Sequence, residues 1–185
     1  MTVVFGMLLM FGTLANAGIV DVIEYPTGYF APGATTSSPY YRWWDEDWGW
    51  AHNPIAGSIT TAELSISAYD VDAPSEVDNI YAWENGGWTL LGNLAGLNND
   101  WGYTTFNLGS EFFDEIAAGL QVYMDIDTTH TYNYWAVTLA KSALSINGGT
   151  IPPPCPGCGV IPEPATMSLL GFGVLGLFGL RRKRS

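Results

Sequence analysis

Three pairs of aspartates in an Asp-x-Asp pattern are the residues of this sequence best placed to do chemistry. The pairs are Asp45 and Asp47, Asp70 and Asp72, and Asp125 and Asp127. Alternate residues of an extended strand point to the same side, so each pair places two carboxylates on one face. Paired carboxylates suit calcium, a hard cation that takes about six to eight oxygen ligands.

The second pair is the best candidate for a calcium site. Asp70 and Asp72 fall at the end of an expected strand, and Glu76 and Asp78 follow closely across a proline turn. An EF-hand is excluded, because Pro74 and the serine after it stand where that loop needs a ligand and a glycine. The alternative is that these carboxylates are solvated and keep strand ends soluble and unpaired.

A dense aromatic segment, SPYYRWWDEDWGWAHNP, contains the second candidate site. Exposed Trp43, Trp44, Trp48 and Trp50, flanked by carboxylates, could stack on sugar rings and bind a glycan. The alternative is that these rings fill the core, which is the usual place for large aromatic side chains.

An enzyme is the hypothesis from another class. Two carboxylates across a cleft can cleave a glycosidic bond, so a secreted glycoside hydrolase or lyase acting on polysaccharide is the alternative function. His52, expected in a loop beside Asn53, and His130 are too isolated in the sequence to indicate a metal or nucleophile triad. No serine lies in a Gly-x-Ser-x-Gly motif, so we expect a protein that is not an enzyme.

The elements that must position these residues are mainly strands. AELSISAYDVD, LQVYMDID and NYWAVTL alternate apolar and other residues, which predicts antiparallel sheet with one wet face. IYAWENGGWTLLG predicts a hairpin, WGYTTFNLG and KSALSI predict further strands, and SEFFDEIAAG alone has helical character, with Ser110 as its cap and Gly119 at its end. Residues 18–146 are therefore expected to form an all-β, antiparallel β-sandwich that resembles a jelly roll.

The charge balance excludes one class of partner. Arg181, Arg182, Lys183 and Arg184 are four of the six basic residues, so only two basic residues, against 18 acidic ones, precede them. A surface that neutralises no phosphates gains nothing from counterion release, and we expect no nucleic-acid binding.

Both ends of the chain read as signals. Residues 1–17 are apolar and end in Ala-Asn-Ala, which predicts a signal peptide cleaved before Gly18, although no basic residue precedes the apolar run. Residues 165–180 are uncharged and predict a short transmembrane helix, and the basic residues that follow predict a cytoplasmic end.

Pro162, Glu163 and Pro164 stand directly ahead of this apolar run. A Pro-Glu-Pro motif, a short span and an arginine-rich end together resemble the PEP-CTERM sorting signal, over residues 162–185. The resemblance implies recognition by an exosortase at the inner membrane of a Gram-negative bacterium, removal of the tail near the Pro-Glu-Pro motif, and transfer of the body to the cell surface or matrix.

Residues 147–161 are rich in proline and glycine and predict a spacer. They contain Cys155 and Cys158, for which we expect a small disulfide ring or a cross-link to another chain rather than a metal site. Taken together, the sequence predicts an exported, non-catalytic structural or adhesive module associated with exopolysaccharide.

Overall fold

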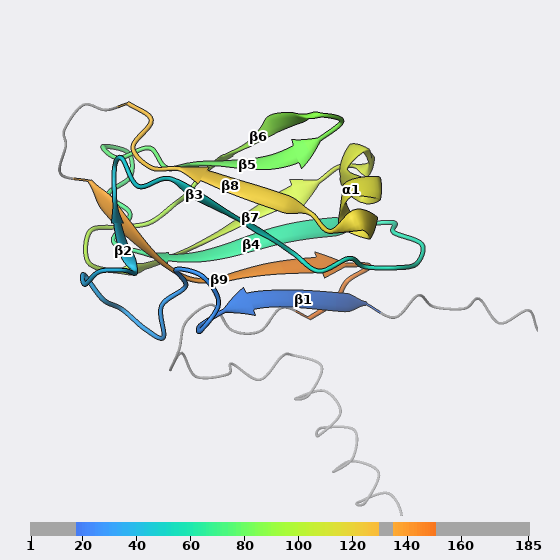
Figure 1. Ribbon diagram of the computed structural model, residues 1–185, viewed down its shortest axis with the longest axis horizontal. Coiled ribbons are helices and arrows are strands. Elements are labelled where there is room, and N and C mark those ends of the chain that lie inside the picture. Colours follow the sequence, from blue (N-terminus) through green and yellow to red (C-terminus); the bar gives the residue numbers. More distant parts are fainter. Residues whose placement is uncertain (1–17, 130–134, 151–185) are drawn as a thin grey trace, which may run out of the picture.

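The computed structural model describes residues 18–129 and 135–150. Within these residues the chain forms strands, one short helix and one 3-10 turn (Figure 1). In chain order they are β1 (Ile19–Glu24), β2 (Tyr41–Trp43), β3 (Trp48–Ala51), β4 (Ala62–Tyr69), β5 (Asn79–Glu84), β6 (Gly87–Asn93), β7 (Trp101–Leu108), η1 (Ser110–Phe112), α1 (Phe113–Ala118), β8 (Gln121–Asp125) and β9 (Ala136–Ile146).

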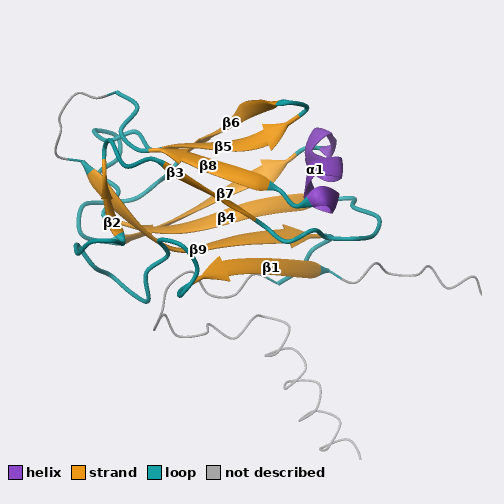
Figure 2. Cartoon of the chain, in the orientation of Figure 1, coloured by secondary structure: helices purple, strands orange, loops and turns teal. Residues whose placement is uncertain are grey.

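The strands form two antiparallel sheets that pack against each other (Figure 2). One sheet has the order β1-β9-β4-β7, with β2 also paired to β9, and the other has the order β3-β8-β5-β6. Apart from β2, the pairs β1–β9, β3–β8, β4–β7 and β5–β6 alternate between the two sheets. This is the pattern of one long antiparallel ribbon rolled up on itself, so the predicted jelly-roll-like sandwich is confirmed.

The core lies between the sheets and consists of the inward-pointing residues of both. Among the fully buried side chains are Leu64, Ile66, Ile80, Leu120, Met124, Ile126, Leu139 and Leu144. The period-2 pattern predicted these positions on β4 and β8, because alternate residues of a strand face the same side.

The expected wet face of β4 is found only at Glu63, which is exposed. Ser65 and Ser67, which alternate with the core residues, are also fully buried, and the Ser65 hydroxyl lies 2.9 Å from that of Thr105 on β7. β4 lies between β7 and β9, so neighbouring strands flank its small side chains on both sides. The last four residues of the run NYWAVTL and the whole run KSALSI, predicted as separate strands, belong to one strand, β9, and all of its residues are buried.

The β5–β6 hairpin forms at the predicted Asn-Gly sequence. Asn85 and Gly86 both have positive φ, 50° and 87°, as a type I′ turn requires. The predicted helical segment is also present, as η1 followed by α1, and it ends at Gly119, where φ is 112°. The capping role predicted for Ser110 is wrong, because Gly109 occupies the N-cap of η1 and no side chain caps it.

Several expectations lie outside the described residues. They are the signal peptide (1–17), the cysteines Cys155 and Cys158, the Pro-Glu-Pro motif, the apolar run 165–180 and the basic end. Among the residues that the structure describes, no helix is long and apolar enough to cross a membrane.

The Asn85-Gly86 turn between β5 and β6 gives a first prediction. Replacing Gly86 with Ala should lower the free energy of unfolding by about 1–2 kcal/mol, because an L-residue is strained in the left-handed region. The Cβ itself would meet no atom within 4 Å, so the loss reports backbone strain alone. Urea denaturation measures it.

Gly87→Ala is the matched control, since its Cβ would come no closer than 4.0 Å to the Glu84 carbonyl oxygen and its φ is not left-handed. Equal losses in the two variants would contradict the assignment of strain to Gly86.

Candidate functional site

The fold gathers the three Asp-x-Asp pairs at one end of the sandwich, opposite α1. β4 ends there, β5 begins there and β8 ends there. Asp47 Oδ1 accepts a hydrogen bond from the backbone N–H of Ile126 (2.9 Å), and Asp78 Oδ1 accepts one from the N–H of Asp127 (3.1 Å). Carboxylates that are far apart in the sequence are therefore neighbours.

Asp70 has a structural role in this group. Its Oδ2 accepts a hydrogen bond from the Tyr41 hydroxyl (2.8 Å), and its Oδ1 accepts one from the backbone N–H of Asn99 (2.6 Å). Burial, followed by the bond to Asp70, raises the pKa of Tyr41. Asp70 thus ties β2 to the connection between β6 and β7.

Glu76 and Asp78 form the buried centre of the group, with 1% and 0% exposure. Glu76 Oε2 accepts a hydrogen bond from the N–H of Asp72 (3.1 Å). However, Glu76 Oε1, Asp78 Oδ2 and Asp127 Oδ2 are buried without a hydrogen-bond donor. Burial, and then the charge of Asp78, raise the pKa of Glu76, and burial with the charge of Asp127 raises that of Asp78.

Buried carboxylates of this kind need a proton or a cation to offset their repulsion. Within residues 18–129 and 135–150, no three His, Cys, Asp or Glu side chains stand together in an arrangement that could hold a metal ion. Of the four residues predicted as calcium ligands, the structure brings Glu76 and Asp78 together in the interior, whereas both oxygens of Asp70 already accept hydrogen bonds. Calcium binding stays a prediction.

The tryptophans predicted to bind glycan divide between core and surface. Trp48 is only 9% exposed, and its ring lies 5.1 Å from that of Phe30 and 4.9 Å from that of Trp50, which also packs against the core. Trp48 and Trp50 point inward because they are alternate residues of β3, and they stand opposite the buried residues Met124 and Val122 of β8. Trp44 is half-buried, and Trp43, 43% exposed, is the member of the set that faces solvent most.

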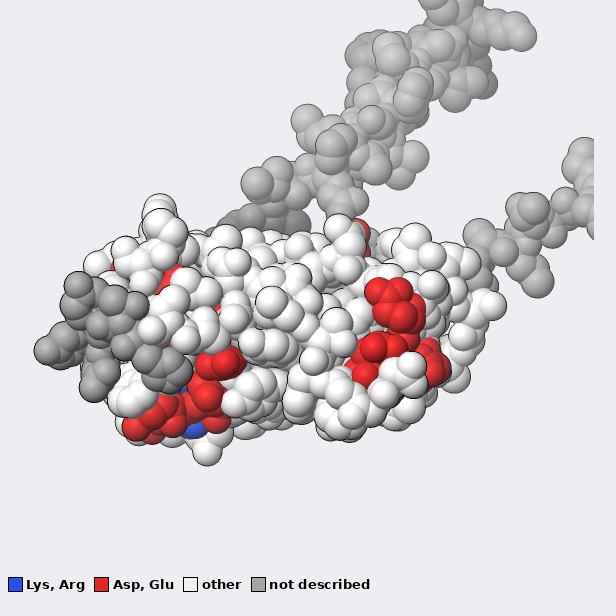
Figure 3. Space-filling model, turned by 90° about the horizontal axis from the view of Figure 1, so that it is seen from above, with Lys and Arg blue, Asp and Glu red and all other residues white. Residues whose placement is uncertain are grey.

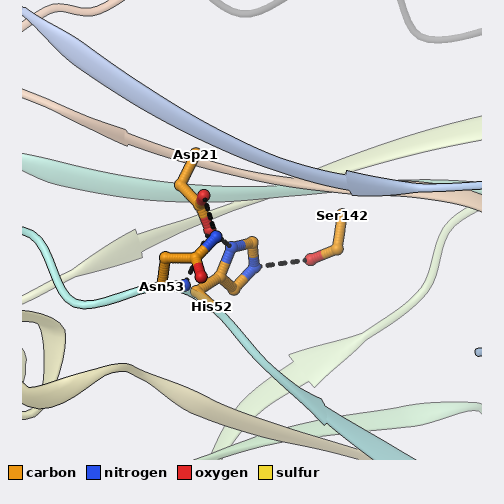
Figure 4. Close-up of polar contacts among 4 residues, drawn as sticks. All are labelled: Asp21, His52, Asn53 and Ser142. Carbon is orange, nitrogen blue, oxygen red and sulfur yellow. Dashed lines mark hydrogen bonds and ion pairs between the residues drawn. The ribbon is translucent and has the colours of Figure 1, made fainter. Parts of the chain in front are cut away.

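A buried polar group that the sequence did not predict lies between the sheets near β1 (Figure 4). His52 Nδ1 lies 2.8 Å from Asp21 Oδ2, and His52 Nε2 lies 2.9 Å from Ser142 Oγ. A carboxylate only accepts, so Nδ1–H donates to Asp21 and the Ser142 hydroxyl donates to Nε2. Asn53 donates from its side-chain amide (2.8 Å) and its backbone N–H (3.0 Å) to the same carboxylate.

Carboxylate, imidazole and hydroxyl here follow the order of a serine-hydrolase triad. Ser142 is 0% exposed and His52 2% exposed, because both point into the sandwich, so a substrate carbonyl cannot reach the hydroxyl. The expected loop position of His52 is correct, since it follows β3, but its side chain is buried. The group joins β9 and β1 of one sheet to the segment after β3 of the other. We therefore interpret it as a polar tie between the sheets.

A second feature that the sequence analysis missed is the outer face of the β3-β8-β5-β6 sheet. Trp83 and Trp88 stand directly opposite each other on β5 and β6, and Tyr81 and Tyr123 do so on β5 and β8. Opposed residues of antiparallel strands point to the same side, so these four rings share one face. Only the strand register reveals this, because the residues come from three separate segments.

The PEP-CTERM protein-sorting motif matches residues 160–184, which confirms the predicted resemblance and indicates an exported protein sorted by an exosortase. No curated protein matches the chain.

Among solved structures, the tobacco streak virus coat protein dimer is similar at 13% identity, with a TM-score of 0.37, over 82% of this chain and 98% of that chain. A second crystal form of that coat protein gives 15% identity, 82% and 99% coverage and a TM-score of 0.36. The infectious bursal disease virus Gt strain structure gives 12% identity, 75% and 34% coverage and a TM-score of 0.36. These values carry no conclusion about what the chain does.

The polar tie predicts loss of stability in acid. Burial lowers the pKa of His52. The hydrogen bond to Asp21 raises it again, but only in part, so the pKa stays below its ordinary value. Burial alone would raise the pKa of Asp21, but the hydrogen bonds from Asn53 and His52 lower it on balance. Below the ordinary histidine pKa of 6.5 the unfolded chain binds a proton at His52 that the folded chain does not, so the contribution of His52 to the free energy of unfolding should fall by up to about 1.4 kcal/mol per pH unit. Glu76 and Asp78, whose pKa values are raised, contribute in the opposite direction, so the slope of His52 is the difference between wild type and a variant that lacks the imidazole.

Urea denaturation at a series of pH values, comparing wild type with His52→Gln, measures this slope. The Gln variant should lose it from about pH 6.5 downwards, whereas Ser142→Ala, which keeps the imidazole, should retain it. Parallel profiles for wild type and His52→Gln would show that His52 is not the group responsible.

The buried carboxylates give a prediction for calcium. At about pH 8, added calcium should raise the melting temperature of the full-length chain, because a cation beside Glu76 and Asp78 would offset their repulsion. The double variant Glu76→Gln/Asp78→Asn should not respond. Asp114→Asn/Glu115→Gln, a matched pair on α1, should respond like wild type.

The same rise with magnesium, or with sodium chloride at equal ionic strength, would indicate general screening. No rise at all would exclude the calcium site and leave a shared proton as the neutralising group.

Proposed function

We propose that this chain, whose residues 160–184 match the PEP-CTERM sorting motif, is a non-catalytic structural or adhesive module of the surface or extracellular matrix of a Gram-negative bacterium. After an exosortase has processed its tail, the sandwich associates with exopolysaccharide. The inner membrane holds the precursor until that step.

The observation that carries this proposal is the position of the motif relative to the sandwich. The last strand, β9, ends at Ile146, and the motif begins at residue 160. Every core residue of the described sandwich lies ahead of the motif. A cut near Pro162 would therefore release the sandwich without removing any of its packing.

The charge of the sandwich supports a partner that carries no phosphate. Arg42 and Lys141 are the basic residues of the described part of the chain. Arg42 lies 4.0 Å from the ring centroid of Tyr29, and Lys141 is 8% exposed and lies 3.6 Å from Glu24. Neither forms a basic patch, so an uncharged, hydroxyl-rich polymer suits this surface better than a nucleic acid.

The absence of catalysis is part of the proposal. The Asp21, His52 and Ser142 group is closed to substrate by burial, and Asp47 and Asp70 use their oxygens to hold the loops at the end of the sandwich. The alternative is a secreted glycoside hydrolase or lyase that uses the clustered carboxylates. New reducing ends in polysaccharide incubated with the protein would favour that alternative, and retention without turnover favours the module.

Replacing Glu163 with Ala tests the sorting step. In a host with an exosortase, wild type should give a membrane-bound precursor and a released form that ends near the Pro-Glu-Pro motif. The variant should accumulate as precursor, because the motif is altered while the sandwich is not. Glu63→Ala, an exposed position on β4, is the matched control and should be processed normally.

Mass spectrometry of the membrane and surface fractions distinguishes the forms. A surface form that still ends in Arg184-Ser185 would mean that the tail is an anchor and not a processed signal.

A further inference from the structure

The outer face of the β3-β8-β5-β6 sheet carries a row of aromatic rings, formed by Tyr81, Trp83, Trp88 and Tyr123. Trp88 is 45% exposed, and Leu90 beside it on β6 is 53% exposed. The other three rings are half-buried. Large aromatic side chains left at a surface in a contiguous group mark a binding surface.

The geometry of the row suits a polymer of sugar rings. The ring centroids of Trp83 and Trp88 are 5.3 Å apart, those of Trp88 and Tyr123 5.5 Å, and those of Tyr81 and Tyr123 6.3 Å. The apolar C–H face of a sugar packs against the electron-rich face of an aromatic ring. Spacings of this size let successive sugars of one chain meet successive rings.

The rings are not coplanar. Their interplanar angles are 80° for Trp83 and Trp88, 40° for Trp88 and Tyr123, and 50° for Tyr81 and Tyr123. A flat crystalline polysaccharide surface could not contact all of them at once. A single, twisted and soluble chain could.

A hollow beside the row adds one polar side-chain amide, that of Gln121. It has a volume of about 370 Å³ and is bordered by Trp88, Tyr123, Gln121 and Gly49. Gly49 stands opposite Tyr123 in the register and has no side chain to cover that ring. A side chain could not replace it easily, because a Cβ would lie 2.7 Å from the carbonyl oxygen of Val122. The Gln121 amide can both donate to and accept from sugar hydroxyls.

The charges around the row select the kind of polymer. None of the strands β3, β5, β6 and β8 contains a lysine or an arginine. Asp47 accepts a hydrogen bond from the Tyr123 hydroxyl (3.2 Å) at one end of the row, and Glu115 accepts one from the backbone N–H of Asn85 (3.2 Å) at the other. Seen from the side of β5 and β6, carboxylates gather toward both ends of the surface, with few between them (Figure 3). An anionic polymer would be repelled.

We propose that this aromatic row binds a single chain of an uncharged polysaccharide, with Trp88 as the central contact. The inference rests on the proposed function, and it names the surface and the chemical class of the ligand. A second copy of the protein suits the face poorly, because any symmetric pairing of two such faces brings acidic ends against acidic ends.

The experiment measures retardation of the full-length protein, in mild detergent, by polysaccharides embedded in a native gel. The probes are the host's purified exopolysaccharide, hydroxyethylcellulose, xyloglucan and dextran as uncharged polymers, and alginate as an anionic one. Wild type should be retarded by at least one uncharged polymer and not by alginate. Trp88→Ala should weaken that binding about tenfold or more, because it removes the central contact. Trp88→Phe should restore part of it.

Tyr103→Ala is the matched control, since Tyr103 is an exposed aromatic residue, 38% against 45% for Trp88, on the other sheet. It should bind like wild type. Melting temperatures of all variants, which should stay close together because both side chains lie outside the core, show that each is folded.

The outcomes separate this inference from the proposed function. If wild type binds and Trp88→Ala binds equally well, the aromatic row is not the site, although the association with polysaccharide stands. If wild type binds none of the polymers, both fail. If Trp88→Ala changes the sedimentation of the protein in sugar-free buffer, the face is an interface between copies and the inference is overturned.

Discussion

The pairing of β9 is the constraint on which the rest of the structure depends. β9 lies between β1 and β4 and also pairs with β2, and all of its residues are buried. Every backbone N–H and C=O group of a buried strand needs a partner, so these neighbours are held in one register. That register places Asp21 of β1 and Ser142 of β9 on either side of His52, and it thereby joins the two sheets. The sandwich closes because its last strand has partners on both sides.

The sequence predicted the elements whose determinants are local. The Asn85-Gly86 turn, the end of α1 at Gly119 and the core positions of β4 and β8 are properties of a few consecutive residues, and each is found in the structure. β1, β2 and β3 were not predicted. β2 and β3 have only three and four residues, too few to show a period-2 pattern, and β1 (IVDVIE) does not alternate apolar and polar residues. The outward side of β4 was expected to be wet, but a strand in the middle of a sheet can bury small polar residues on both faces.

The candidate sites also depend on strand pairing that the sequence does not reveal. The density of tryptophan in one segment drew attention to Trp48 and Trp50, yet alternation on β3 turns both into the core. Trp88 and Tyr123 are not conspicuous in the sequence, and they meet only because β8, β5 and β6 are neighbours in the sheet. His52 lies 31 residues from Asp21 and 90 from Ser142, so no local spacing could indicate their contact. Properties that depend on register have to be seen in the fold.

The pairing of the first strand with the last also affects how the chain folds. Contacts between residues so distant in sequence form slowly, because a long loop must close before they are made. A chain is synthesised from its amino end, so β1 exists long before β9 does. Until then the edges of β1 and β4 lack the partner they share, and open edges of this kind can pair with other chains. β9, the last strand before the sorting motif, is thus the one that completes the fold, and a chain that ends before Ala136 would keep both edges open.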